Sequence, residues 1–227
     1  DVSEFILENS DVDNDAYNRM STVYLVGKTI PMFSSEMADF LSLKALNKRC
    51  AIVVDITIGL DGEIIKYSFY EALIESKARL SYNDVDDFLS NRIYNSDCDI
   101  VSDPLLALNE LQGLLIESRG RNNIIPPNRE DYRNILDFNR KIEKIEKIET
   151  NQSHKMVEEA MLCANKCASK FVASVFGNAI YKKQSGIIEG KETSTFLFLK
   201  DYIDFKKELL FSASGFKKLM HKIEEHP

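Results

Sequence analysis

The sequence contains two clusters of aspartates, the residue type that binds hard divalent cations. Asp11, Asp13 and Asp15 have the alternating spacing of a calcium-binding loop. Such a loop also needs glycine at its sixth position and glutamate at its twelfth, because the chain must turn sharply and then supply a bidentate ligand. Ala16 and Thr22 occupy these positions, so the sequence does not predict a calcium site.

The second cluster, formed by Asp84, Asp86 and Asp87, has a spacing similar to that of the aspartates in a nuclease that uses two metal ions. Asn83 or Asp84 can instead cap a helix over residues 84–90, which would place the acidic side chains on a solvated face. We therefore expect no metal ligands in this chain.

Aromatic and acidic side chains elsewhere could bind a nucleic acid. Single-stranded RNA is held by stacking its bases on aromatic faces, and Tyr24 and Tyr82 offer such faces. A carboxylate on a rigid helix can accept a hydrogen bond from the ribose hydroxyls of RNA, as Glu158 or Glu159 could. Adjacent helical residues point about 100° apart, so at most one of these glutamates is expected to face a site. On residue type alone, structural tyrosines and a solvated acidic face are the simpler interpretation.

A mixture of strands and helices must position these residues. The β-branched run 50–58 predicts a buried strand, and a turn at Asp61-Gly62 leads to a returning strand over 63–74. Apolar periodicity predicts helices over residues 84–90, 104–120, 153–175, 191–203 and 214–225. Extended segments are expected over residues 22–32, 140–149 and 178–181, with a polar loop over 91–103. The pattern predicts an α+β fold with a mixed or antiparallel sheet and helices packed on it.

The helix over 153–175 has the strongest pattern. Ser153 is expected to cap it and Gly177 to end it. Its predicted apolar stripe includes Met156, Val157 and Ala160.

The composition is that of an ordinary folded protein. The chain has 227 residues, of which 44% are hydrophobic and 29% charged, and no apolar run approaches the ~20 residues of a membrane span. The acidic N-terminal residues lack the layout of a signal peptide. Four cysteines without a CxxC motif disfavour zinc and disulfides and indicate a reducing cytoplasm. The net charge of −7 argues mildly against nucleic-acid binding, although a narrow channel can be basic inside an acidic surface.

Three segments together resemble the catalytic (RNB) domain of the ribonuclease II and ribonuclease R family. They are Tyr24–Met32, Tyr67–Asp84 and Met156–Met161, which read YLVGKTIPM, YSFYEALIESKARLSYND and MVEEAM. Members of this family are processive 3′→5′ exoribonucleases. The resemblance covers nearly the whole chain, and it implies that residues 1–227 are the central part of an RNB catalytic domain.

The resemblance implies roles for three residues. Tyr24 would clamp bases at the neck of an RNA channel, Tyr82 would pack against the terminal nucleotides, and Glu158 would lie near the last nucleotide. Tyr82 and Glu158 are therefore candidate catalytic residues, and all three are candidate RNA-binding residues. The resemblance also implies single-stranded RNA as the partner, nucleoside monophosphates as the products and Mg²⁺ as the cofactor of the complete enzyme, with no membrane association.

Parts of the family's active site have no counterpart here. The upstream aspartate cluster and the downstream arginine segment are missing, so the Mg²⁺ ligands are expected outside this chain, and the 227 residues alone are expected to be inactive. The segment Ile124–Asn128 lacks the aromatic residue that would sandwich a base with Tyr24. Arg119–Arg129 is interpreted mainly as a surface charge cluster, and His154 and His221 as surface residues.

Two alternatives remain open. The missing aromatic residue and the acidic charge favour a catalytically inactive RNB-like module that binds RNA or a protein. Without the resemblance, the sequence describes an α+β scaffold of unknown use.

Overall fold

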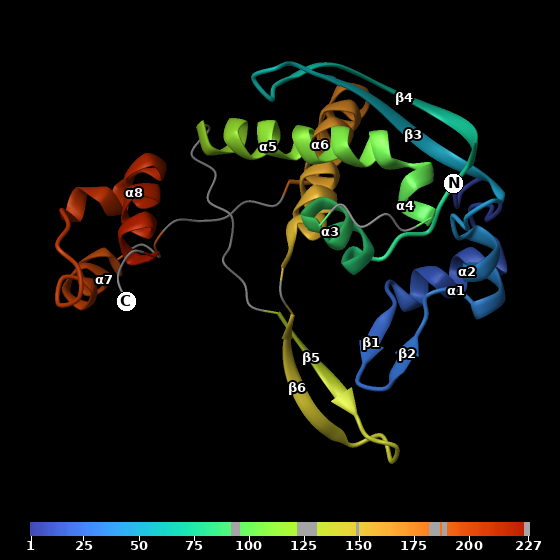
Figure 1. Ribbon diagram of the computed structural model, residues 1–227, viewed down its shortest axis with the longest axis horizontal. Helices are drawn as coiled ribbons and strands as arrows, with labels where there is room; N and C mark the ends of the chain where they lie inside the picture. The colour runs from blue at the N-terminus through green and yellow to red at the C-terminus, as the bar shows by residue number, and fades with distance from the viewer. Residues whose placement is uncertain (92–95, 122–130, 149, 182–186, 188–189, 225–227) are drawn as a thin grey trace.

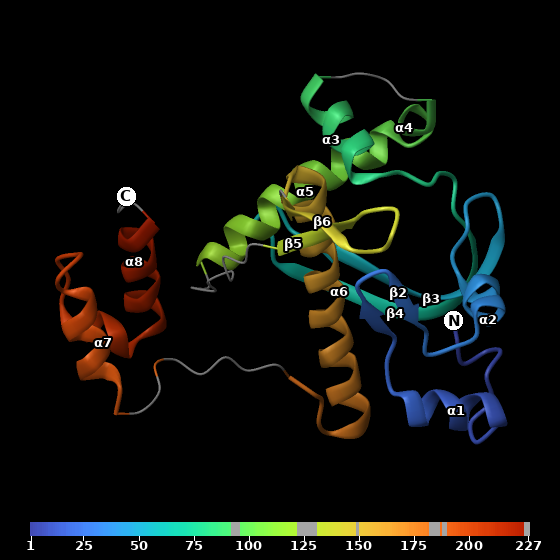
Figure 2. The same ribbon diagram turned by 90° about the horizontal axis from the view of Figure 1, so that it is seen from below.

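The computed structural model describes residues 1–91, 96–121, 131–148, 150–181, 187 and 190–224, and it has the expected α+β fold (Figure 1). The described strands form three separate antiparallel hairpins rather than one continuous sheet. The helices pack among the hairpins, and the longest helix runs through the middle of the molecule (Figures 1 and 2).

The first hairpin corrects the expectation of one extended segment over 22–32. β1 (Val23–Leu25) pairs with β2 (Lys28–Ile30), with Tyr24 opposite Thr29. Gly27 reverses the chain with a φ of 75°, a conformation that glycine adopts without a steric penalty.

The second hairpin confirms the predicted strands. β3 (Lys48–Ile58) pairs with β4 (Ile64–Glu75), and their turn lies against a helix. Gly62 has a φ of 74°, and a Cβ atom there would come within 2.3 Å of the Leu114 carbonyl oxygen. Ser118 Oγ donates a hydrogen bond of 2.6 Å to Glu63 Oε1, which fastens the same turn.

The third hairpin pairs β5 (Asp131–Leu136) with β6 (Ile142–Ile148), in agreement with the extended segment expected over 140–149. Its isoleucines recur every third residue, so successive ones point to opposite faces. Ile142 and Ile145 are exposed, and the hairpin projects away from the helices (Figure 1).

The helices agree with most of the predicted ranges. They are α1 (Asp11–Arg19), α2 (Ser35–Leu41), α3 (Tyr82–Asn91), α4 (Ser96–Ile100), α5 (Ser102–Arg121), α6 (Gln152–Phe176), α7 (Glu192–Leu199) and α8 (Ala213–Glu224), with a 3-10 helix η1 (Lys207–Phe211). A polar loop was predicted over residues 91–103, and this prediction was wrong for residues 96–100, which form α4. Residues 178–181 form no strand, so that expectation was also wrong.

Helix α6 is central to the packing, as its strong periodicity predicted. Its buried face consists of Ser153, Met156, Glu159, Cys163 and Cys167. The predicted stripe had the right period but was rotated, because Val157 lies on the exposed side. Gly177 ends the helix in the left-handed conformation, as expected.

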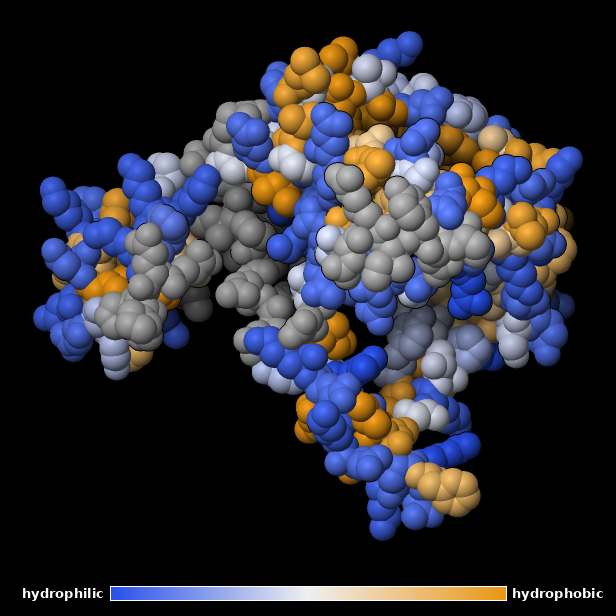
Figure 3. Space-filling model, viewed as in Figure 1, coloured by the Kyte–Doolittle hydropathy of each residue, from blue (hydrophilic) through white to orange (hydrophobic). Residues whose placement is uncertain are grey.

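Helix α6 contacts α5, α3 and β3. The ring of Phe171 lies 5.1 Å from that of Phe69 on β4, which adds an aromatic contact between helix and hairpin. Apolar side chains gather along the upper edge in Figure 3, over β3, β4 and the end of α6. Exposed residues on these elements include Ile52, Ile65, Leu73 and Phe176.

The C-terminal helices have a small core of their own, formed by Ile203, Phe205, Leu210 and Leu219. The Lys217 ammonium group donates a hydrogen bond to the Gly120 carbonyl at the end of α5. Among the described helices, none is long and apolar enough to cross a membrane.

Candidate functional site

Tyr82 and His154 form a stacked aromatic pair where α3 and α6 begin. Their ring centroids are 3.8 Å apart and their planes differ by 16°. His154 was interpreted as a surface residue, and the structure corrects this, because the imidazole lies against the phenol ring and its Nδ1 atom is buried. The stack covers one face of Tyr82, while 45% of the residue remains exposed.

Local hydrogen bonds place Tyr82 at the start of α3. The Ser81 amide donates to Asp84 Oδ2 and the Asp84 amide donates to Ser81 Oγ, both at 3.2 Å. This reciprocal arrangement is a capping box. Asn83 or Asp84 was expected to cap this helix. The cap is instead Ser81, so Tyr82 is the first helical residue.

A carboxylate from α3 fixes the start of α6. Asp86 Oδ1 accepts a hydrogen bond of 2.9 Å from the Ser153 amide. Ser153 was expected to cap this helix with its own side chain, but it lies inside the first turn, and Asn151 at the cap position makes no side-chain cap bond. Asp86 is half-buried at this contact rather than on a solvated face, and it therefore ties together the two helices that carry the stacked rings.

A pocket of about 420 Å³ opens beside the stack. Its lining residues come from the two helix starts and from the third hairpin, and they are Ser81, Tyr82, Asn83, Arg133, Lys147, Ile148, Asn151 and His154. The Arg133 guanidinium also bonds to Glu146 Oε2 at 2.9 Å and is largely exposed. An aromatic face, two amide side chains and two cations suit a ligand that combines a flat ring with a negative charge.

Glu158 follows His154 by four residues on α6, so the two side chains lie on the same face about 6 Å apart along the axis. The Glu158 side chain is 50% exposed, and its Oε1 atom lies 3.9 Å from Arg119 Nη1. It does not line the pocket at Tyr82.

Glu159 points into the protein instead. Its Oε1 atom lies 2.6 Å from Arg119 Nη2, and the carboxylate is buried between α5 and α6. Burial raises the pKa of Glu159, Arg119 opposes the rise, and Glu158 adds to it. Arg119 therefore lies between both glutamates, which corrects its interpretation as part of a surface cluster, whereas residues 122–129 of that segment lie outside the described residues.

Tyr24 is separate from the stacked pair. It is 79% exposed on the first hairpin and does not line the pocket at Tyr82. A Cβ atom added at Gly27, in the turn of this hairpin, would lie 2.8 Å from Leu136 Cδ1 at the end of β5. The first hairpin therefore touches the third, which supplies Arg133 to the pocket. The structure brings Tyr82 and Glu158 to one side of α6 and leaves Tyr24 on a neighbouring element.

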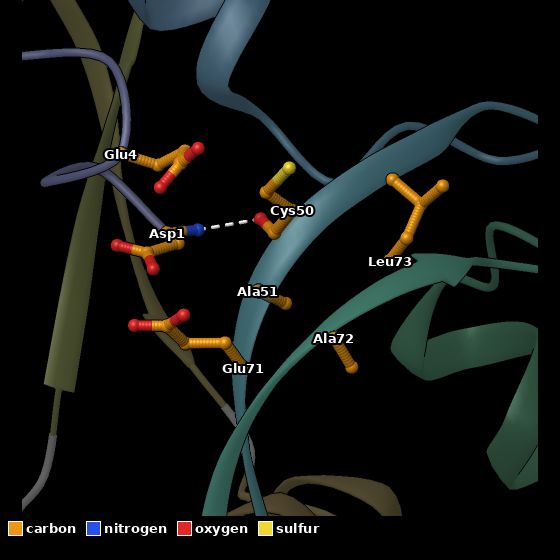
Figure 4. Close-up of a pocket in the computed structure, with 7 residues that line it drawn as sticks. All are labelled: Asp1, Glu4, Cys50, Ala51, Glu71, Ala72 and Leu73. Atoms are coloured by element: carbon orange, nitrogen blue, oxygen red, sulfur yellow. Dashed lines mark hydrogen bonds between the residues drawn. The ribbon is translucent and has the colours of Figure 1, made fainter.

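A second pocket, of about 240 Å³, lies between the N-terminal residues and the β3–β4 hairpin (Figure 4). Asp1, Glu4 and Glu71 line it, and the main-chain nitrogen of Asp1 donates a hydrogen bond of 2.5 Å to the Cys50 carbonyl. Within the described part of the chain, no group of three carboxylate, histidine or cysteine side chains could hold a metal ion.

Sequence reasoning missed the contacts of two residues, His154 and Arg119, which it placed on the surface, whereas the structure confirms that only one of Glu158 and Glu159 faces outward. The spacing of four residues between His154 and Glu158 on one helix could have indicated that His154 lies on the same face as the candidate glutamate. No local signal indicates that Arg119 pairs with Glu159, because their helices meet only in the tertiary structure.

Known structures share this arrangement of elements. Mycoplasma genitalium RNase R in complex with ribose-methylated single-stranded RNA matches 100% of this chain with a TM-score of 0.89 and 23% identity, over 36% of its own chain. Yeast Ssd1, described as a pseudonuclease, matches 88% of this chain with a TM-score of 0.62 and 18% identity, over 24% of its own chain.

The sequence is also similar to those of bacterial proteins named Exoribonuclease 2. Exoribonuclease 2 of Buchnera aphidicola is 34% identical over 99% of this chain, and that of Proteus mirabilis is 31% identical over 100% of it. The chain spans 36% of the length of each of these relatives. The model of the RNB domain matches residues 1–227. The chain therefore belongs to the RNB domain family.

Proposed function

We propose that this chain forms the RNA-holding part of a 3′→5′ exoribonuclease that hydrolyses single-stranded RNA to nucleoside monophosphates. Membership of the RNB family and the relatives named Exoribonuclease 2 support the reaction class. The observation that carries the proposal is the pocket at Tyr82, because it joins a stacking surface to cationic side chains.

In this proposal the open face of Tyr82 stacks on a base near the RNA 3′ end. Arg133 and Lys147 neutralise nearby phosphates, and the starts of α3 and α6 add positive potential. Glu158, one helical turn from His154, accepts a hydrogen bond from a ribose hydroxyl. Tyr24 holds a more distant base from the first hairpin. Fixing the RNA end in this way lowers the entropic part of the hydrolytic barrier.

We propose Mg²⁺ as the metal of the complete protein, where it would activate water and stabilise charge on the scissile phosphate. The described residues do not provide a fitting donor set. The ligands would therefore come from other parts of the protein, with residues 1–227 forming the central part of the catalytic domain. The four cysteines are free thiols, which is consistent with a reducing cytoplasm.

The test is the rate and end product of RNA degradation by the complete protein with Mg²⁺. Tyr82→Ala should raise KM for a 5′-labelled oligoribonucleotide at least about tenfold and lengthen the final product, because a base loses its stacking surface. Tyr17→Ala is the control, since Tyr17 is an exposed tyrosine on α1. The same KM and product length for both variants would remove Tyr82 from the site.

A second candidate is an RNB-like module that binds RNA or a protein without catalysis. The structural likeness to yeast Ssd1, a pseudonuclease, favours it. In the same experiment this candidate predicts that RNA binding depends on Tyr82 while no nucleotide is released at any Mg²⁺ concentration.

A further inference from the structure

We propose that His154 is a positioning residue. Its imidazole stacks on one face of the Tyr82 ring and fixes the ring's orientation, so that only the other face accepts a nucleobase. This inference rests on the proposed function. It assigns a role to a side chain that the sequence placed on the surface.

The two rings of the pair are in close contact. A centroid separation of 3.8 Å and an angle of 16° bring the rings into close parallel contact, so no base can insert between them without moving one ring. Tyr82 is half exposed, and both residues line the same pocket. Because His154 covers one face of the phenol ring, a nucleobase that stacks on Tyr82 can use only the opposite face.

The start of α6 holds His154 next to α3. His154 lies in the first turn of α6, directly after Ser153, whose amide bonds to Asp86 Oδ1 on α3. The bond ties the start of α6 to the helix that carries Tyr82. The two rings thus project from helices joined by a hydrogen bond, and their relative orientation is built into the fold.

No hydrogen bond among the described residues accounts for the buried Nδ1 atom of His154. Burying a polar atom in this way opposes folding. An aliphatic side chain would fill this position without burying a polar atom, whereas a flat ring is required to stack on Tyr82.

The position of His154 along α6 also relates it to Glu158. His154 and Glu158 share a helix face, so the residue that supports the base-stacking ring and the residue that would accept the ribose hydroxyl have a fixed spacing. A shift of Tyr82 would therefore move the base relative to Glu158, not only weaken its binding.

The experiment compares His154→Ala with His154→Phe in the complete protein, with Val157→Ala on the exposed side of α6 as the matched control. His154→Ala should weaken binding of a single-stranded oligoribonucleotide, measured in EDTA, by about two- to tenfold, because aromatic pairs contribute energies of that size. His154→Phe should bind within about twofold of the parent, since it keeps the stack. Equal loss in both variants, or no loss in His154→Ala, would overturn the inference.

Nuclear magnetic resonance gives a readout that does not depend on activity. In the complete protein, the ring protons of His154 are assigned as the histidine signals that His154→Phe lacks. We expect the His154 ring protons to be shifted upfield by the Tyr82 ring current, and Tyr82→Leu to remove the shift. An unshifted His154 in the parent protein would overturn the inference. Absence of RNA hydrolysis in the parent would count against the proposed exoribonuclease alone, because the spectrum and the EDTA binding measurement need no turnover.

Discussion

Arg119 on α5 and Glu159 on α6 form a short ion pair, with Nη2 and Oε1 2.6 Å apart, in which the carboxylate is buried and the arginine side chain is 19% exposed. The same guanidinium approaches Glu158 with its other nitrogen. The buried pair therefore holds a positive charge close to Glu158, the glutamate that is proposed to bind RNA.

Removing Arg119 should destabilise the protein. Arg119→Gln leaves Glu159 buried without its cation, and we expect the free energy of unfolding at pH 7 to fall by about 3 kcal/mol, as for other broken buried pairs. Urea unfolding of the parent and the variant measures the difference. Lys155→Gln on the exposed side of α6 is the control and should change stability by less than about 0.5 kcal/mol.

The cost of Arg119→Gln should depend on pH with a defined sign. Burial already raises the pKa of Glu159 above its ordinary value of 4.5, and loss of the cation raises it further. The folded variant then binds a proton more tightly than the unfolded chain, so its stability decreases as the pH rises from 4.5 through the folded-state pKa. The difference from the parent should therefore be smallest at acidic pH. A difference that is constant between pH 4 and pH 8 would contradict this account.

Glu158 should discriminate between RNA and DNA. Glu158→Ala removes the proposed acceptor for a ribose hydroxyl, so we expect the affinity for an oligoribonucleotide to fall about tenfold and that for the matching DNA to change little. Binding measured in EDTA checks this without turnover. Glu110→Ala on the exposed surface of α5 serves as the control, and equal losses for RNA and DNA would contradict the assignment.

Asp86 should contribute to stability through the cap that it provides to another helix. Asp86→Ala removes the acceptor for the Ser153 amide, and we expect a loss of about 1 kcal/mol. Asp87→Ala is the matched control, because Asp87 is the exposed neighbour of Asp86 on α3. Thermal unfolding of the two variants gives the comparison, and indistinguishable midpoints would show that the cap contributes nothing.

The turn between β3 and β4 should tolerate only glycine at residue 62. Gly62→Ala introduces a Cβ atom 2.3 Å from the Leu114 carbonyl oxygen at a positive φ, so we expect a loss of at least about 2 kcal/mol. Gly113→Ala in α5 has open space around the new Cβ and should instead raise stability by about 0.5–1 kcal/mol. Denaturant unfolding measures both changes, and a Gly62→Ala variant as stable as the parent would disprove the close contact.

Local patterns were sufficient for much of the secondary structure. The β-branched run before Asp61-Gly62 predicted β3 and β4, and apolar periodicity predicted α5 and α6. Short elements were the failures, since α4 formed within a polar segment and residues 178–181 formed no strand. A few residues have too little periodicity to outweigh their packing surroundings.

The family resemblance selected Tyr82 and Glu158 from the sequence, but it did not indicate what surrounds them. The stack of Tyr82 on His154, the cap of Asp86 on Ser153 and the pair of Arg119 with Glu159 each join two different helices. Periodicity describes which face of one helix is apolar, and it carries no information about which residue of another helix will meet that face. Those partners were decided by how α3, α5 and α6 pack, because ring stacking and charge pairing act only over a few ångströms.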